Sequence, residues 1–296
     1  MIDFSDGKVH LWLCDTSAVQ MDDLAKETCD AVLPESEITA VYRFKFDADK
    51  KMALASRLLM RDAISKFAST PHQEIEIERD KSGKKPIWKP RGSPKEFMHF
   101  NVGHDNDMVV MGASLYLVGV DIMKYQVPRA GRSVADFFSS LRGTFQESEW
   151  EYIRGDPDEQ KQLKRFMWLW TMKEAYVKCF GTGLYVAPER LRCEFPDDKE
   201  APATTEAQIF VDGVPQEKFT FFHKEAMNGQ FVVCICLAPP PEAHELYRSQ
   251  IAPEYLERFM SAPPLRLESG KVEVHPVDLQ GLMEDLVLDL VLTPVF

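Results

Sequence analysis

Several common signals are absent from this chain of 296 residues. Its six cysteines are too few for a disulfide scaffold and include no CxxC pair, so we expect buried free thiols. The first residues show no basic segment followed by an apolar core, and no apolar run reaches about 18 residues. We therefore expect no signal peptide and no membrane span. Free thiols without a signal peptide are typical of the cytoplasm, where we expect the protein.

Catalytic signatures that depend on a single local motif are also missing. The sequence has no GxxxxGK[ST] phosphate loop, no GxSxG elbow and no HExxH pair, which argues against P-loop nucleotidases, α/β-hydrolases and zinc proteases. An excess of positive charge is missing too, because 35 Lys and Arg stand against 47 Asp and Glu, giving −12 at pH 7. This balance argues against nucleic acid or an anionic membrane as the main partner.

The negative charge is unevenly distributed along the chain. From Arg43 to Glu96 there are 14 Lys and Arg against 8 Asp and Glu, a net of +6. Residues 242–296 hold 4 basic and 10 acidic side chains, a net of −6. A basic region in an acidic protein suits a small polyanionic ligand, and it equally suits a solvated helix face. Composition leaves both interpretations open.

Apolar patterns predict the same order of elements twice. In the first unit they predict a strand at 9–14, a helix at 47–67 and strands at 97–102 and 108–113. In the second they predict a strand at 116–123, helices at 133–141, from 144 and from 156 to a stop at Gly181, then strands at 209–212, 219–223 and 231–237. We therefore predict an α+β fold of two similar units, residues 1–115 and 116–241. An acidic extension, 242–296, follows with helices near 247–259 and 279–290.

The first candidate for chemistry lies in the strand at 116–123. Gly119, Asp121 and Met123 share one face of this strand. Asp121 is therefore in mid-strand beside a residue with no side chain, where a ligand can approach closely. A buried carboxylate requires a metal, a cation or several donors. A purely structural aspartate is the alternative at this point.

The second candidate lies in the long helix that ends near Gly181. Steps of three or four residues from Leu163 place Glu174 on the apolar stripe of this helix. Lys178 follows one turn later and can pair with Glu174. The alternative interpretation of the two residues is an ordinary salt bridge on the helix surface. Two inward carboxylates from different elements, Asp121 and Glu174, suit Mg²⁺, which takes one or two carboxylates together with substrate phosphates.

A third candidate is His104, which we predict in the polar loop after the strand at 97–102. Loops frequently carry functional side chains. The alternative is a polar surface histidine with no further role.

In their order and spacing these segments resemble the 4′-phosphopantetheinyl transferases of the larger, surfactin-type subfamily, in particular its fungal and animal members. Residues 100–105 (FNVGHD) resemble the family motif F-N-x-S-H, residues 119–121 (GVD) resemble G-x-D, and residues 170–175 (WTMKEA) resemble W-x-x-K-E-[AS]. Lys178 stands where the family has a further lysine, and residues 57–61 and 85–86 match earlier basic motifs. The resemblance covers about residues 9–237.

The resemblance implies two similar α+β halves related by a pseudo-twofold axis, and it implies a reaction. Coenzyme A would be the substrate, with Mg²⁺ or Mn²⁺ on its diphosphate. The serine hydroxyl of an acyl or peptidyl carrier protein would attack the β-phosphate, so that the phosphopantetheine arm is transferred and adenosine 3′,5′-bisphosphate leaves. Carrier domains of polyketide synthases, nonribosomal peptide synthetases and the aminoadipate reductases of lysine biosynthesis are the implied partners. We expect a monomer.

Roles for individual residues follow from the same resemblance. Asp121 and Glu174 would hold the metal, and Glu174 or a water that it orients would accept the serine proton. Lys178 would stabilise charge on the phosphates, with help from Lys173. The residues that would contact the phosphates of coenzyme A are Arg61, Lys85 and His104.

Two positions depart from the family pattern. Met123 stands where many bacterial members have a second acid, and Gly103 replaces the usual serine before the histidine. Two other functions share the metal and the basic region: a magnesium-dependent hydrolase of nucleotide diphosphates, and a non-catalytic module that binds coenzyme A or a carrier protein. The presence of Asp121, Glu174 and Lys178 together favours the transferase.

Overall fold

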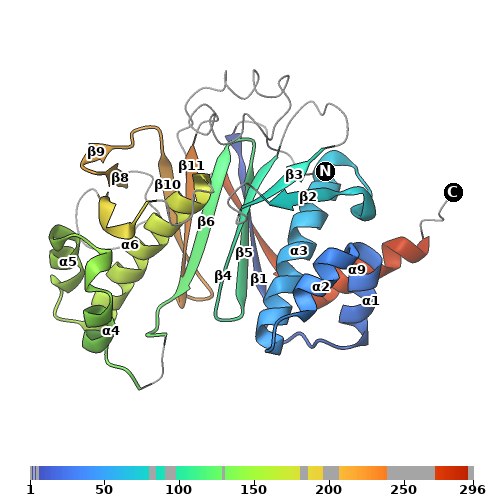
Figure 1. Ribbon diagram of the computed structural model, residues 1–296, viewed down its shortest axis with the longest axis horizontal. Coiled ribbons are helices and arrows are strands. Elements are labelled where there is room, and N and C mark those ends of the chain that lie inside the picture. Colours follow the sequence, from blue (N-terminus) through green and yellow to red (C-terminus); the bar gives the residue numbers. More distant parts are fainter. Residues whose placement is uncertain are drawn as a thin grey trace.

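The computed structural model describes residues 2, 4, 7–79, 85–90, 98–128, 131–180, 186–195, 207–238 and 271–292 (Figure 1). The stop at Gly181 and the predicted helix at 247–259 lie outside them. The elements mix helices with several small sheets, which confirms the α+β class. Within the described residues no helix is long and apolar enough to cross a membrane.

Up to residue 115, the described part of the N-terminal half contains five strands, three helices and the 3-10 turn η2. They are β1 (Val9–Asp15), α1 (Asp23–Val32), α2 (Glu35–Tyr42), α3 (Asp47–Ala68), η2 (His72–Glu74), β2 (Glu76–Arg79), β3 (Pro86–Lys89), β4 (His99–Asp105) and β5 (Met108–Ser114).

The C-terminal half follows without a break, and a last strand and helix come after it. These elements are β6 (Leu117–Lys124), α4 (Val134–Ser140), η3 (Arg142–Thr144), α5 (Glu147–Arg154), α6 (Glu159–Phe180), η5 (Pro188–Arg190), β7 (Leu191–Glu194), β8 (Gln208–Val211), β9 (Val214–Pro215), β10 (Thr220–Ala226), β11 (Phe231–Ala238), β12 (Val272–Asp278) and α9 (Leu279–Leu292).

The two halves use the same pattern of strand pairing. In the N-terminal sheet β5 lies between β1 and β4, and in the C-terminal sheet β11 lies between β6 and β10, all antiparallel. Each sheet thus consists of an early strand followed, after a helix of 22 residues, by a hairpin whose second strand pairs with the early one. This repeat of topology is the one that the sequence pattern predicts, whereas the twofold axis stays an expectation from the resemblance.

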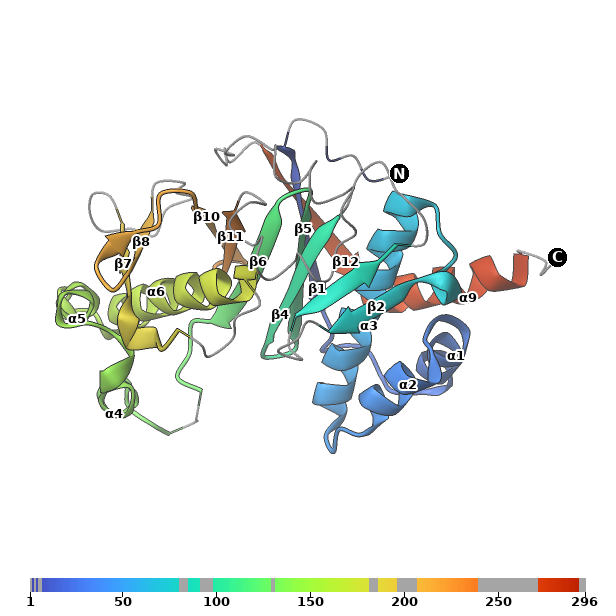
Figure 2. The same cartoon turned by 45° about the horizontal axis from the view of Figure 1, so that its top comes forward.

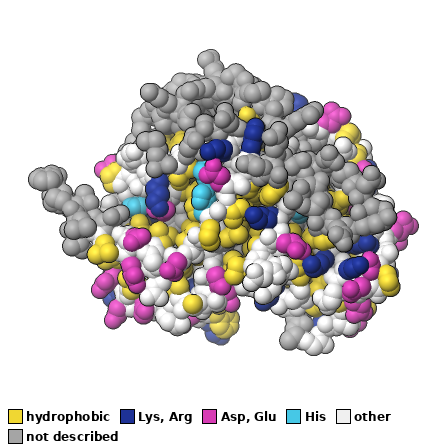
Figure 3. Space-filling model, turned by 180° about the vertical axis from the view of Figure 1, so that it is seen from behind, with side chains coloured by type: hydrophobic (Ala, Val, Ile, Leu, Met, Phe, Trp, Pro, Cys, Tyr) yellow, Lys and Arg dark blue, Asp and Glu magenta, His cyan; other side chains and the backbone are white. Residues whose placement is uncertain are grey.

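The two sheets meet in the middle of the molecule, with α3 covering one outer face and α6 the other (Figures 1 and 2). Between them lies a dry layer of apolar side chains, in which Val9 and Leu11 of β1 join Val120 and Ile122 of β6 and Val233 of β11. Each fully buried side chain of this kind contributes roughly 2 kcal/mol. Seen from behind, charged side chains of both signs surround a centre of hydrophobic side chains and histidines (Figure 3).

Side chains of β4 also join the two halves through polar contacts. The Oδ1 of Asn101 accepts a hydrogen bond of 3.0 Å from the backbone N–H of Val120, and the Oδ2 of Asp105 accepts one of 2.8 Å from that of Lys124. Because β4 and β6 are not paired in one sheet, these bonds satisfy backbone donors of β6 that would otherwise be buried without a partner.

Gly119 allows α6 to lie directly on β6. A Cβ at this position would be 2.8 Å from the Cα of Cys179 and still closer to the carbonyl oxygen of Ala175. Both are backbone atoms of α6, which cannot move away without displacing the helix. The glycine therefore sets the separation between the strand that carries Asp121 and the helix that carries Glu174.

The observed elements correct three details of the predictions. His104 lies within β4 and not in a loop, because the hairpin continues to a tight turn at Asn106 and Asp107, both with positive φ. The helix predicted from 144 begins at Glu147, where the side chains of Gln146 and Glu149 form the capping box. The long helix begins at Glu159 and not at 156.

The segment after residue 270 belongs to the N-terminal half. β12 lies parallel to β1 at the edge of the N-terminal sheet, and α9 buries Leu279, Met283 and Leu286 in the core of that half. The helix predicted at 279–290 is confirmed, whereas β12 was not predicted. All six cysteines are buried and free, as expected.

Candidate active site

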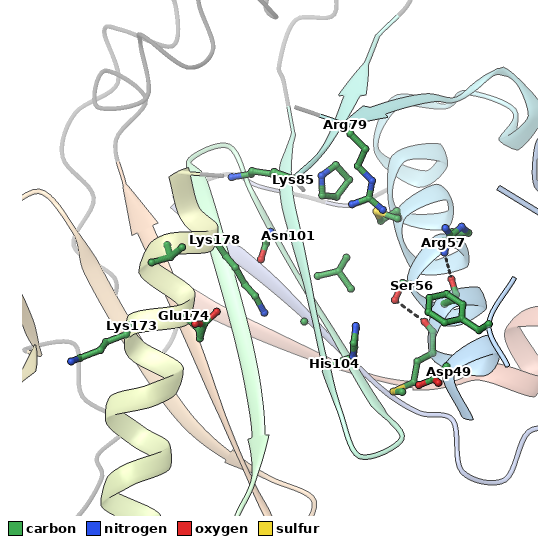
Figure 4. Close-up of a pocket in the computed structure, with 18 of the residues that line it drawn as sticks. Asp49, Ser56, Arg57, Arg79, Lys85, Asn101, His104, Lys173, Glu174 and Lys178 are labelled. Atoms are coloured by element: carbon green, nitrogen blue, oxygen red, sulfur yellow. Dashed lines mark hydrogen bonds between the residues drawn. The ribbon is translucent and has the colours of Figure 1, made fainter. Parts of the chain in front are cut away.

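A cavity of about 500 Å³ lies between α3 on one side and β4 and α6 on the other (Figure 4). Its lining combines aliphatic side chains with a concentration of charged ones. The charged and histidine side chains in its wall are Arg43, Asp49, Arg57, Arg79, Lys85, His104, Lys173, Glu174 and Lys178. A volume of this size is typical of sites for ligands as large as a nucleotide.

Two of the predicted residues, Glu174 and Lys178, line one side of this cavity, and Lys178 contacts the third, Asp121, behind the lining. Glu174 and Lys178 are one turn apart on α6 and line the cavity (Figure 4). Lys173 also contributes to the wall, but its Nζ is turned toward Glu149. The Nζ of Lys178 lies 2.6 Å from the Oδ1 of Asp121 on β6. The cation thus bridges the helix and the strand that carry the two carboxylates.

Asp121 is only 5% exposed, and burial raises the pKa of its carboxyl, with Lys178 opposing the rise. Its second oxygen, Oδ2, is buried and has no hydrogen-bond partner among the described residues. A buried carboxylate oxygen without a donor is costly unless something else satisfies it.

Gly103 of β4 accounts for the space around this pair. A Cβ at Gly103 would lie 3.3 Å from the Nζ of Lys178 and 3.3 Å from the Cα of Asp121. The residue that departs from the family motif is therefore packed directly against the charged pair.

His104 extends into the cavity from β4, on the side opposite Glu174 (Figure 4). Partial burial and the nearby Lys178 lower the pKa of its imidazole below the ordinary value. The ring is therefore neutral at pH 7 and offers one donor and one acceptor to a ligand.

Lys85 lines one end of the cavity but is only 4% exposed. Its Nζ donates hydrogen bonds to the carbonyl oxygens of Val118 (3.2 Å) and Cys179 (2.6 Å). The ammonium thereby connects the start of β6 with the end of α6 and adds positive charge behind the cavity wall.

Two of the expected phosphate contacts are engaged inside the protein instead. Arg61 is 1% exposed and does not line the cavity, because its guanidinium pairs with Glu37 at 2.8 Å and donates to the carbonyl oxygen of His72 at 2.7 Å. Lys173 is 2% exposed, and its Nζ lies 2.8 Å from the Oε2 of Glu149. Their positions give both residues a structural role.

Three arginines that the sequence did not assign face the cavity in place of Arg61. Arg43 follows α2, while Arg57 on α3 and Arg79 at the end of β2 lie on the side of the cavity opposite Glu174 (Figure 4). Burial lowers the pKa of Arg57, the carboxylate of Glu37 at 4.0 Å opposes the shift, and Arg79 and Arg43 add to it. Its Nε is buried without a hydrogen-bond partner in the described part of the chain. Such a group of cations is built for an anion of high charge.

Comparison with known protein families shows which family the chain belongs to. A model of the N-terminal region of 4′-phosphopantetheinyl transferases matches residues 25–116, and a model of the 4′-phosphopantetheinyl transferase superfamily matches residues 117–236. The chain belongs to this superfamily. The resemblance seen in the sequence motifs is thereby confirmed, and the protein is an enzyme of the phosphopantetheinyl transferase class.

Individual phosphopantetheinyl transferases are similar over most of the chain. A phosphopantetheinyl transferase of Thraustochytrium sp. is 34% identical over 271 residues, which cover 90% of this chain and 89% of the relative. The L-aminoadipate-semialdehyde dehydrogenase-phosphopantetheinyl transferase of Homo sapiens is 31% identical over 223 residues, covering 74% and 72%. The enzyme of the same name from Schizosaccharomyces pombe is 31% identical over 187 residues, covering 60% and 70%.

The side chains of this phosphopantetheinyl transferase fit a divalent cation. The unpartnered Oδ2 of Asp121 is a hard oxygen ligand, and Glu174 supplies a second carboxylate from the facing helix. With Met123 in place of a second strand acid, two protein carboxylates are available, a number that Mg²⁺ commonly accepts when water and phosphate complete its shell.

Proposed function

We propose that the protein transfers the 4′-phosphopantetheine arm of coenzyme A to a serine of an apo carrier protein, with Mg²⁺, and releases adenosine 3′,5′-bisphosphate. One observation carries the proposal: Glu174 and Lys178, the latter bonded to the half-satisfied Asp121, line a cavity whose lining also holds three arginines. The carboxylates can bind a metal cation, and the arginines can bind phosphates. Such a site suits a donor that carries both a diphosphate and a further phosphate.

The donor is bound chiefly through its charge. Arg43, Arg57 and Arg79 supply the cationic wall, and the planar guanidinium of arginine suits bidentate contacts with phosphate. We assign His104 and Lys85 to the same task, His104 through a direct contact of its neutral imidazole and Lys85 through its charge. The apolar part of the lining, which includes Met52 and Val177, receives the uncharged parts of coenzyme A.

Asp121 and Glu174 would hold the metal. Bound there, Mg²⁺ neutralises the charge of the diphosphate and polarises the phosphoryl oxygens. Lys178 keeps its contact with Asp121 and lies close enough to the cavity to stabilise charge that builds up on the transferred phosphoryl group and on the leaving group.

The transfer itself is a displacement at phosphorus. A bond forms between the carrier's serine oxygen and the β-phosphorus, and the bond from that phosphorus to the bridging oxygen breaks. Glu174 accepts the serine proton, directly or through a water that it orients, and adenosine 3′,5′-bisphosphate leaves with the electron pair of the broken bond. Positioning and charge neutralisation supply most of the rate enhancement of such reactions.

We place the carrier protein at the rim of the cavity next to the loop between α2 and α3. Phe44 is 36% exposed and Phe46 is 62% exposed, and Arg43 and Lys45 lie between and beside them. Aromatic side chains among cations form a surface that suits an acidic partner with an apolar patch. Because the human relative is named for L-aminoadipate-semialdehyde dehydrogenase, we include the carrier domain of such an enzyme among the substrates to test.

The experiment that tests this function measures release of adenosine 3′,5′-bisphosphate from coenzyme A with and without an apo carrier protein. We expect release only when both the carrier and Mg²⁺ or Mn²⁺ are present, in a one-to-one ratio with holo carrier. Cleavage of coenzyme A in water alone would establish the hydrolase, and binding without turnover would establish the non-catalytic module.

A further inference from the structure

Three side chains outside the active site come together where the last strand joins the first. In the parallel register of β1 and β12, His10 is opposite Glu273 and Trp12 is opposite His275. The Nδ1 of His10 lies 2.8 Å from the Nε2 of His275 and 3.7 Å from the Oε2 of Glu273. One ligand atom from each residue lies within 4.8 Å of the other two, and the described residues contain no second group of three with this property.

We propose that His10, Glu273 and His275 form a binding site for a divalent transition metal of the Zn²⁺ type. Zinc binds nitrogen and oxygen at about 2.0–2.2 Å, so that two ligands of a tetrahedral site are about 3.4 Å apart. The two distances from the Nδ1 of His10, 2.8 Å and 3.7 Å, lie on either side of that value. The remaining distance, between His275 and Glu273, is within 4.8 Å, so shifts on the order of 1 Å in these side chains would bring all three to coordination distance.

The donor set distinguishes this site from the magnesium site of the transferase. Two imidazoles and one carboxylate suit Zn²⁺, Co²⁺ or Ni²⁺, whereas Mg²⁺ prefers oxygen ligands only. Three protein ligands leave one position of a tetrahedron for water. None of the three residues lines the cavity described above, so the two metals would bind independently.

The surroundings hold the two rings in place. His10 is 3% exposed, with the edge of Phe4 against it at 4.8 Å between ring centroids, and Trp12 stacks on His275 at 5.3 Å. Loss of hydration and the neighbouring His10 lower the pKa of His275. The 2.8 Å between Nδ1 of His10 and Nε2 of His275 is a hydrogen-bond distance, so one of the two nitrogens carries a proton in the metal-free protein. A metal would bind both once that proton has moved to the other nitrogen of its ring or has been released.

One cation competes with the metal for the carboxylate. The Nζ of Lys8 lies 2.8 Å from the Oε1 of Glu273, and both side chains are partly exposed. Because an exposed pair of this kind contributes little, a divalent ion can displace the ammonium at small cost. Removal of Lys8 should therefore strengthen metal binding.

The position of the site gives it a structural consequence. Among the described residues β12 is an edge strand paired with β1 alone, and it leads into α9, which fills part of the N-terminal core. A metal shared by His10 and His275 would link segments 265 positions apart in the sequence. Such a link would stabilise the attachment of β12 and α9, because a ligand that binds only the folded chain raises its stability.

The test uses the full chain without a metal-binding tag, freed of metal by a chelator and titrated with ZnCl₂ in a calorimeter, with bound metal counted by mass spectrometry. We expect one Zn²⁺ per chain, a rise in melting temperature, and visible absorption bands when Co²⁺ is used instead. His10→Ala and His275→Ala should each weaken binding by at least about 100-fold, because loss of a ligand exceeds the effect of an outer contact. Lys8→Ala should tighten binding.

His72→Ala, on η2 and outside the cluster, is the matched control and should bind Zn²⁺ as the wild type does. If His10→Ala does not fold, the more conservative His275→Gln is used to remove a ligand. Circular dichroism and phosphopantetheine transfer report whether each variant folds. The proposal is overturned if the wild type binds no Zn²⁺ in a one-to-one ratio, or if binding is unchanged in the His275 variants.

Discussion

Lys178 donates a hydrogen bond of 2.6 Å to one carboxylate oxygen of Asp121, while the other oxygen is buried without a partner among the described residues. A purely structural aspartate would have both oxygens satisfied, because an unpaired buried acceptor costs about 1–3 kcal/mol. The arrangement instead suits a carboxylate that binds a cation during function.

The first prediction concerns Asp121→Asn. We expect at least about a 100-fold loss of transfer, because the amide cannot replace an ionised metal ligand. We expect the free energy of unfolding at pH 7 to change little. Burial raises the pKa of Asp121, which means that keeping its carboxylate charged costs free energy, and the neutral amide removes this cost. Lys178, which loses its charged partner, is 28% exposed and reaches water. Transfer rates across a series of Mg²⁺ concentrations and urea unfolding check both statements. Wild-type activity at low Mg²⁺ would contradict the role of Asp121.

The second prediction separates two arginines that are four residues apart on α3. Arg57→Ala should raise the KM for coenzyme A by about 10- to 100-fold with little change in kcat, because a charge-assisted contact to phosphate is lost. Arg61→Ala should instead lower the free energy of unfolding by about 3 kcal/mol, since the half-buried Glu37 would lose its 2.8 Å contact and keep only the Nε of Arg57 at 4.0 Å. Steady-state kinetics and urea unfolding of both variants decide the matter, and the reverse pattern would contradict these assignments.

Gly119 provides a third prediction. Gly119→Ala places a Cβ 2.8 Å from the Cα of Cys179, with two further backbone atoms of α6 closer still, so α6 must move away from β6. We expect a loss of about 3 kcal/mol or more in the free energy of unfolding. In any fraction of the variant that folds, the transfer rate should respond less strongly to Mg²⁺. The matched control is Gly143→Ala, where a Cβ meets nothing within 4 Å, and its stability should stay within about 0.5 kcal/mol of the wild type.

Acid sensitivity gives the fourth prediction. His223 is buried on β10 next to the carbonyl oxygen of Trp168, and burial lowers its pKa to about 4 from an ordinary 6.5. Because the unfolded chain takes up a proton more readily, stability that is present above pH 6.5 is lost as the pH falls toward 4. Between pH 7 and pH 5 this amounts to about 2 kcal/mol.

Urea unfolding of the wild type and of His223→Gln at both pH values measures this difference. The variant should be less stable than the wild type at pH 7 and should lose about 2 kcal/mol less on acidification. Equal losses in both proteins would show that His223 does not titrate in this range.

Much of the fold follows from local patterns in the sequence. The helical spacing of Leu54, Leu58 and Ile64 predicts α3, and alternation around Asp121 predicts β6, because each element buries one continuous apolar face. The strand β12 could not be predicted in the same way, since its pairing with β1 depends on a partner more than 250 positions away. Such pairing leaves no local signal.

The site was predictable in chemistry but not in detail. The residue types and their order pointed to Asp121, Glu174 and Lys178, and the structure brings the three together. Whether Arg57 or Arg61 faces the cavity depends on the tilt of α3 against α2, which helical spacing does not specify.

The most direct test of the account is the intact mass of an apo carrier protein after incubation with coenzyme A, Mg²⁺ and either the wild type or Glu174→Gln. The wild type should add the mass of one phosphopantetheine arm to the carrier. The variant should fold, with an unchanged circular dichroism spectrum, and should leave the carrier's mass unchanged over the same time, because the amide neither binds the metal as a carboxylate does nor accepts the serine proton. A carrier fully converted by Glu174→Gln at the wild-type rate would contradict the account.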